Sequence, residues 1–422
     1  MVNHNNKTNN RAFPISIALW IITSLWPVLG NVVSYVMGWA VIIIGLYYYP
    51  ILLRKRAFVY LFLFLLICLI YSLIGKGYPF INVAIFFPTF FACVVASYGI
   101  SRMPQKQIYC LFYILLGLLL FSVVSTFFIL QENPNAVRNV GYGENTEIGV
   151  TKAMSLAYAR RGMYSYGTGE ALAVITPAFL VFALNTKRVI WSILIFLTVG
   201  MAIITQIIGT LATSSIITLV SSSAVLLASA FLSNHKQKLR YGIVIISFIL
   251  FGLYYLVPII VENSSMMTKI IDIEDSYTTG ESTGLVGGRT DLMLQSIYVF
   301  LRNPVFGFGD IPRFFGDTHN GNTVSMHSAF FDYLGLYGMF AFLFFLSWKK
   351  ATEFTYRMIS AKQRKKYVWC LLSAVFLCVL KGPVTLTTTF QFSTVFTGIV
   401  FMMVYYSSNL EIIGNEKNSN MG

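Results

Sequence analysis

Charged residues are scarce in this sequence, and acidic residues are confined to a few segments. Only 11% of the 422 residues are charged and 56% are hydrophobic, whereas soluble proteins carry charge on about a quarter of their residues. No Asp or Glu precedes Glu132, and none lies between Glu170 and Glu262. This composition excludes an ordinary soluble domain and leaves two polar segments, 132–170 and 262–317, that hold most of the acids.

The residues for metal and nucleotide chemistry are also lacking. The five cysteines lie in apolar runs without metal-ligand spacing, so we interpret them as small buried hydrophobic side chains. No phosphate-binding loop for ATP is present, so any reaction must use an already activated substrate. Asp272, Glu274 and Asp275 stand among Ser, Thr and Gly, which favours a solvated loop tip over a metal site. We expect neither a metal nor a cofactor.

Long apolar runs fill most of the chain. About 20 apolar residues suffice to cross the hydrocarbon core as a helix, and such helices satisfy their own backbone hydrogen bonds. The sequence therefore predicts an all-α polytopic membrane protein, forming a single integral membrane domain over residues 1–422. Twelve spans are expected, at 13–30, 32–52, 57–74, 80–99, 108–130, 169–185, 189–208, 211–232, 243–261, 327–347, 367–381 and 386–406.

Basic residues predict the orientation. The net charge of +14 is spread over short loops between spans, which indicates the positive-inside pattern rather than a nucleic-acid surface. With both termini cytoplasmic, the long loops at about 131–168 and 262–326 lie on the outer face. The basic loops are Arg54–Arg56, Arg102 with Lys106, Lys187–Arg188, His235–Arg240 and Lys349–Lys366.

The first outer loop carries Arg160 and Arg161 just before the sixth span, against the positive-inside trend. Guanidinium groups bind phosphate oxygens bidentately and stay charged, so this pair is a candidate diphosphate clamp. The alternative is that the two arginines anchor the loop to lipid headgroups or pair with Glu170.

The second outer loop contains Gly287-Gly288-Arg289, an amphipathic stretch at Thr290–Arg302, and then Asn303-Pro304-x-x-Gly307-x-Gly309. The amphipathic stretch predicts a helix on the membrane surface or packed on the bundle. Arg289 falls near its N-terminus, which favours anions. Gly307 and Gly309 permit a tight turn in which backbone approaches a ligand, although a simple turn would need the same residues.

His327 opens the tenth span, at the expected outer face, where a histidine can titrate and meet a polar substrate. An interfacial or helix-capping histidine is the alternative. Asp332 lies inside the same span but about 140° round the helix from His327, so it is not an obvious partner. A second histidine, His319, lies in the turn-rich segment just before.

The order Gly288-Arg289, amphipathic helix, Asn303-Pro304-x-x-Gly307-x-Gly309, then His327 resembles the O-antigen polymerase (Wzy) and O-antigen ligase superfamily of bacterial membrane glycosyltransferases. The resemblance implies a GT-C-like enzyme of the bacterial inner membrane that acts at its outer face. Its substrates would be undecaprenyl diphosphate-linked oligosaccharides. In polymerases of this kind the growing glycan moves onto a new lipid-linked repeat of O-antigen or capsule.

The resemblance also implies roles for residues. His327 resembles the outer-face histidine proposed as the base, with His319 as its rival, and Arg289 with Arg160 or Arg161 resembles the diphosphate-contacting arginines. A polymerase pattern of Arg, ten residues and Gly can be matched from Arg138. Membrane lipids and a chain-length regulator protein are the implied partners.

Three alternatives stay open. A ligase would perform the same metal-independent, inverting chemistry with lipid A core as the acceptor. A flippase for lipid-linked oligosaccharides should line its centre with cations, but the spans carry almost none, and no internal repeat of broken helices is found. A peptidoglycan-polymerising relative would share the architecture.

Overall fold

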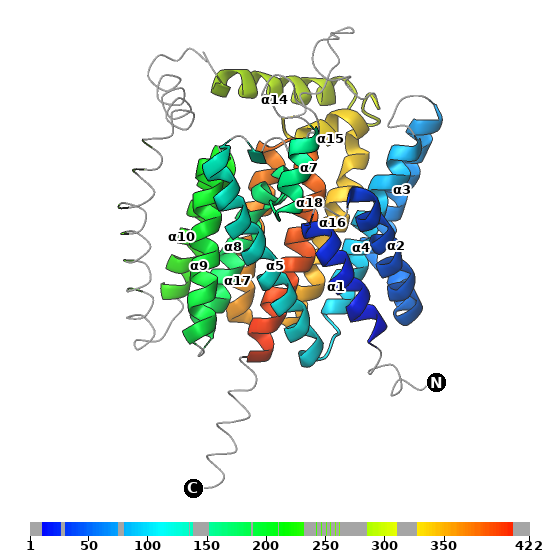
Figure 1. Ribbon diagram of the computed structural model, residues 1–422. Helices are drawn as coiled ribbons and strands as arrows, with labels where there is room; N and C mark the ends of the chain where they lie inside the picture. Colours follow the sequence, from blue (N-terminus) through cyan, green and yellow to red (C-terminus); the bar gives the residue numbers. More distant parts are fainter. Residues whose placement is uncertain are drawn as a thin grey trace, which may run out of the picture.

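The computed structural model describes residues 11–26, 30–74, 80–134, 136–137, 152–186, 189–209, 211–231, 285–309 and 327–407, with single positions between 242 and 261. Every element in this described part is a helix, and the long helices run side by side in one bundle (Figure 1). The protein is an all-α polytopic membrane protein, as predicted.

The first half of the bundle is formed by helices that alternate in direction. They are α1 (Ala12–Leu25), α2 (Gly30–Tyr48), α3 (Arg56–Leu73), α4 (Phe80–Ile100), α5 (Gln105–Glu132), α8 (Tyr166–Asn185), α9 (Val189–Ile208) and α10 (Ala212–Phe231). A short 3₁₀ turn, η3 (Pro50–Arg54), links α2 to α3, and α7 (Lys152–Arg160) precedes α8. The sequence had not predicted α7, which falls in the first expected outer loop.

The second half begins with α14 (Leu285–Arg302), which lies across one end of the bundle (Figure 1). It is followed by α15 (Ala329–Tyr337), the 3₁₀ turn η6 (Gly338–Phe340), α16 (Ala341–Met358) and α17 (Ala361–Leu380). A second 3₁₀ turn, η7 (Pro383–Thr385), leads to α18 (Leu386–Gln391), the π-helical turn η8 (Phe392–Phe396) and a final helical stretch to Ser407.

Seven helices in the described part are long and apolar enough to cross a membrane, and three shorter apolar ones accompany them. Each expected span overlaps one or more described helices, except the span at 243–261, most of which lies outside the described residues. The thin break expected near Gly209 does separate two helices, whereas the first break was placed too late, because α1 ends at Leu25 and α2 already begins at Gly30.

Two boundaries were predicted wrongly. The surface helix α14 begins at Leu285, so Gly287, Gly288 and Arg289 lie inside it rather than before it. A glycine inside a helix costs only about 1 kcal/mol relative to Ala, and tertiary packing can offset that. The tenth span is also broken, because Gly338 adopts a φ of 56° and ends α15 before α16 begins.

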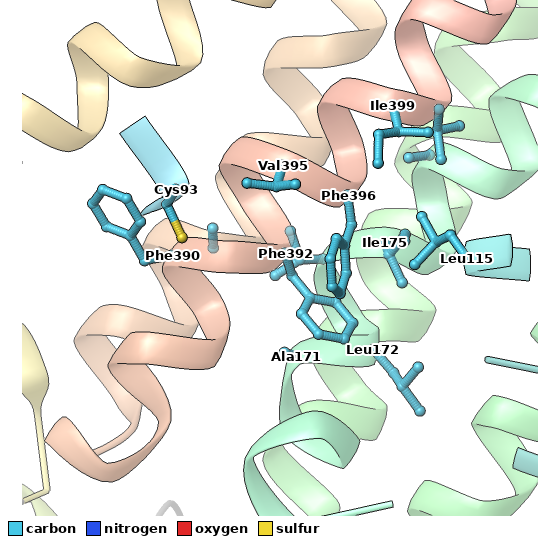
Figure 2. Close-up of a cluster of buried hydrophobic side chains, with 14 of the residues drawn as sticks. Cys93, Leu115, Ala171, Leu172, Ile175, Phe390, Phe392, Val395, Phe396 and Ile399 are labelled. Carbon is cyan, nitrogen blue, oxygen red and sulfur yellow. The ribbon is translucent and has the colours of Figure 1, made fainter. Parts of the chain in front are cut away.

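The centre of the bundle is formed by α8 and the C-terminal helix. Their apolar windows are 94% and 89% buried, far more than those of the outer helices. Figure 2 shows Phe392 and Phe396 beside Leu172 and Ile175 of α8, and the two phenylalanine rings lie 4.6 Å apart. Small residues are frequent in α8, which lets neighbouring helices approach it closely; they are Gly169, Ala171, Ala173, Ala178 and Ala183, all of them buried.

Candidate functional site

The candidate site lies at the end of the bundle where α7, α14 and α15 gather (Figure 1). Of the expected basic loops, Arg54–Arg56 and Arg102 with Lys106 lie at the opposite end (Figure 1), where Tyr406 Oη donates to the carbonyl of Met103 at 2.6 Å. The described candidate residues Arg160, Arg161 and His327 thus lie at the end of the bundle away from these two basic loops.

His327 is half-buried and stands immediately before the cap of α15. Ser328 is the N-cap, since its Oγ accepts a hydrogen bond from Phe331 N at 3.4 Å. The amide of Ser328 in turn donates to Asp332 Oδ2 at 3.2 Å. The helix therefore begins at Ala329, and the backbone beside His327 is fixed by its own cap.

Asp332 joins α15 to the surface helix α14. Its side chain is fully buried, and Oδ1 accepts a hydrogen bond from Ser296 Oγ of α14 at 2.7 Å. Burying an acidic side chain within a membrane span costs free energy, so such residues usually have a functional or structural role. Here the carboxylate connects the helix whose backbone carries Arg289 to the helix that His327 precedes.

The segment Asn303–Gly309 crosses the break between α15 and α16. Gly307 and Gly309 have φ values of 67° and 66°, and Asn303 Nδ2 donates to the carbonyl of Gly307 at 2.7 Å. Phe308 N donates to the Gly335 carbonyl at 3.0 Å, and Gly309 N to the Leu336 carbonyl at 2.7 Å. The expected tight turn is present.

The close backbone approach at this turn is to the chain itself. A Cβ added to Gly307 would collide with the carbonyl oxygen of Leu336, and one added to Gly338 with that of Val305. Tyr71 Oη of α3 also donates to the carbonyl of Phe306. The glycines thus lock the loop onto the helix break, and a ligand contact for them stays a prediction.

Arg161 forms an ion pair with Glu132 at the end of α5, not with Glu170. Its two terminal nitrogens lie 2.6 Å from the two carboxylate oxygens, and both side chains are about half exposed. The hydrogen bonds to Glu132 raise the pKa of Arg161. Exposed pairs are weak, so an incoming phosphate can compete for Arg161. Arg160 ends α7 and is also exposed.

Glu170 instead pairs with Lys381. Lys381 Nζ lies 2.7 Å from Glu170 Oε1, and their side chains are 9% and 0% exposed. Sequence reasoning missed this pair. A signal was available, because the two residues have opposite charge and stand at the expected outer ends of the sixth and eleventh spans. Six residues before Glu170, burial raises the pKa of the Tyr164 hydroxyl, which stays neutral.

Several predicted residues cannot be placed. Arg138, His319 and the acids Asp272, Glu274 and Asp275 lie outside the described residues, and of Arg289 only the backbone position in α14 is described. In the part of the chain that is described, no group of three or more His, Cys, Asp or Glu could hold a metal.

An apolar cavity of about 330 Å³ lies between α16 and α17 and reaches α15 at Phe330, three residues from His327. It is lined mainly by hydrocarbon and aromatic side chains, with Trp348, Leu371 and Val375 among them. An extended apolar chain fits such a lining, whereas a sugar does not.

Residues 201–346 match the O-antigen ligase family. The matched segment contains α10, α14, the Asn303–Gly309 crossing and His327. The match supports the superfamily of O-antigen ligases and polymerases and implies a glycosyltransferase-like activity on a lipid-linked glycan. No curated protein matches the chain. Glu170 and Lys381 both lie outside the matched segment.

Proposed function

We propose that the protein polymerises surface polysaccharide at the outer face of a bacterial inner membrane. The growing glycan moves from undecaprenyl diphosphate onto a new lipid-linked repeat of O-antigen or capsule. The observation that carries the proposal is the joining of α14 to α15 by Ser296 and Asp332, inside the segment that matches the O-antigen ligase family.

His327 acts as the base in this reaction. It takes the proton from the acceptor hydroxyl as that oxygen attacks the anomeric carbon of the donor. The bond from the anomeric carbon to the diphosphate breaks in the same step, so a single displacement inverts the configuration. The half-buried position of His327 at the start of α15 supports this role, and His319 is the rival for it.

The arginines stabilise the leaving diphosphate as its charge develops. The backbone of Arg289 lies in α14, and Arg160 at the end of α7 and Arg161 directly after it lie at the same end of the bundle. Arg138 is a further candidate from the first loop. With these cations the reaction requires neither a metal nor a nucleotide.

The apolar cavity beside Phe330 holds part of a prenyl tail. Its lining is mainly apolar and includes Phe330, three residues after His327, so a lipid bound there would present its diphosphate at the end of the bundle. Holding both substrates in one place raises their effective concentration.

A ligase is the second candidate, favoured by the description of the matching family as O-antigen ligase. The chemistry at the donor would be the same, and lipid A core would replace the lipid-linked repeat as acceptor. A flippase is less favoured, because Lys381, the buried cation among the described residues at the end of the bundle that carries the candidate residues, is neutralised by Glu170.

Reconstitution of the purified protein with defined lipid-linked repeats distinguishes these functions. Chain growth in proteoliposomes without lipid A core supports the polymerase. Transfer only when lipid A core is present supports the ligase. Movement of intact lipid-linked repeats across the bilayer without any new glycosidic bond would overturn both and favour the flippase.

A further inference from the structure

The ion pair between Lys381 and Glu170 is buried where α8 begins and α17 ends. Glu170 is in the second turn of α8 and has no exposed surface, and Lys381 directly follows α17. The ammonium also lies 5.9 Å from the ring centre of Tyr166. A buried pair gains little net stability, because desolvation offsets the attraction between the charges. Stability alone therefore does not explain why a buried ion pair occurs at this position.

The backbone of Lys381 supplies one. Its carbonyl accepts a hydrogen bond from Ala329 N at 2.7 Å, and Ala329 is the first residue of α15, two positions after His327. Lys381 thus contacts α8 through its side chain and α15 through its main chain. The extended backbone at Lys381 leads directly into Gly382 and Pro383 of the next turn.

The backbone next to Glu170 is held by neighbouring helices. Gln206 Nε2 of α9 donates to the carbonyl of Gly169 at 2.8 Å, and Thr218 Oγ1 of α10 donates to Gln206 Oε1 at 2.9 Å. All these side chains are buried. Glu170 therefore stands on a hydrogen-bonded connection among α8, α9 and α10, and provides a fixed point for Lys381.

We propose that Lys381 is a positioning residue, which through its ion pair with Glu170 and its carbonyl bond to Ala329 sets where His327 stands. The expected effect of Lys381 on glycan transfer rests on the proposed function. Its expected effect on the position of His327 holds whatever reaction the protein performs. The competing explanation is that the pair only helps the bundle to fold.

The test compares full-length variants in the same membrane reconstitution. Losing one partner of a buried pair destabilises a protein strongly, whereas replacing both by uncharged groups of similar size is tolerated, so the informative variant is Glu170→Gln with Lys381→Met. Glu170→Lys with Lys381→Glu restores a pair with reversed polarity. The control is Glu353→Gln with Lys350→Met, which removes a more exposed pair of 2.6 Å on α16 together with the 2.8 Å pair between Arg357 and Glu353.

Two readouts are measured on each variant: kcat and KM for glycan transfer, and the rate at which diethylpyrocarbonate modifies His327, followed by mass spectrometry of that peptide. We expect the neutral Glu170/Lys381 variant to fold, to lose about 10²-fold in kcat with little change in KM, and to show a several-fold altered modification rate. The reversed pair should restore both readouts toward the parent protein, and the control should leave both unchanged.

A neutral variant that folds and keeps the parent's kcat and modification rate would overturn the proposal, as would a control variant that changes both readouts equally. Should the parent protein transfer no glycan to any acceptor, the proposed function fails, but the modification rate still decides whether the pair positions His327.

Discussion

The hydrogen bond from Ser296 to Asp332 allows a quantitative test of how α14 is held. The bond is 2.7 Å long, both side chains are fully buried, and the acceptor is a carboxylate. A hydrogen bond to a charged group contributes about 1.5–3 kcal/mol, against about 0.5–1.5 kcal/mol between neutral groups. Ser296→Ala leaves the carboxylate buried with one donor fewer, so we expect a loss of about 2–3 kcal/mol in the free energy of unfolding.

Ser347→Ala provides the matched control. Ser347 is equally buried and also donates a 2.7 Å hydrogen bond, but to the neutral carbonyl of Ala57. The expected loss is about 1 kcal/mol. The comparison therefore isolates the charge of the acceptor, since residue type, burial and bond length are the same.

Both variants are assayed by thermal unfolding in detergent and by limited proteolysis of the folded protein. Ser296→Ala should unfold at a lower temperature than Ser347→Ala and should be cleaved faster within Leu285–Arg302, because α14 loses its bond to α15. Equal unfolding temperatures, together with no added cleavage in that helix, would refute the reasoning that Asp332 anchors α14.

His327→Ala should leave thermal unfolding unchanged and reduce glycan transfer by about 10²–10⁴-fold, as expected for a lost general base; normal chain growth on gels would contradict that role. Arg289→Ala should lose far more transfer activity than Arg289→Lys if charge dominates at the diphosphate, whereas equal loss indicates bidentate contact. Gly307→Ala should lower the free energy of unfolding by about 1–2 kcal/mol for the left-handed φ of that position. The added methyl also collides with the Leu336 carbonyl, which increases the loss. An unchanged unfolding temperature would contradict the close crossing.

Hydrophobic runs and their interruptions predicted most of the bundle. Apolar length alone identifies a span, so the thin break near Gly209 was placed correctly and the one between α1 and α2 was recognised, although it lies before Gly30. The break at Gly338 was missed, because the apolar run continues through it. What ends α15 there is a crossing with Val305 and Gly307, about thirty residues earlier in the chain.

Tertiary partners could not be predicted from local pattern. Ser296 and Asp332 are 36 residues apart, and Glu170 and Lys381 are 211 apart, so neither spacing has a helical or strand period. The turn at Gly307 and Gly309 was correctly expected from residue type. Its contact was not, because a glycine permits a close approach without specifying what approaches.

The helix that follows His327 depends on these distant contacts. α15 has nine residues, too few for a stable isolated helix. Separate elements fix it: α14 through Ser296, the Asn303–Gly309 crossing through the Gly335 and Leu336 carbonyls, and the α17–η7 junction through Lys381. The last of these, together with its partner Glu170, lies outside the segment that matches the O-antigen ligase family. The matched segment can therefore supply the histidine, but the rest of the bundle is needed to hold it in place.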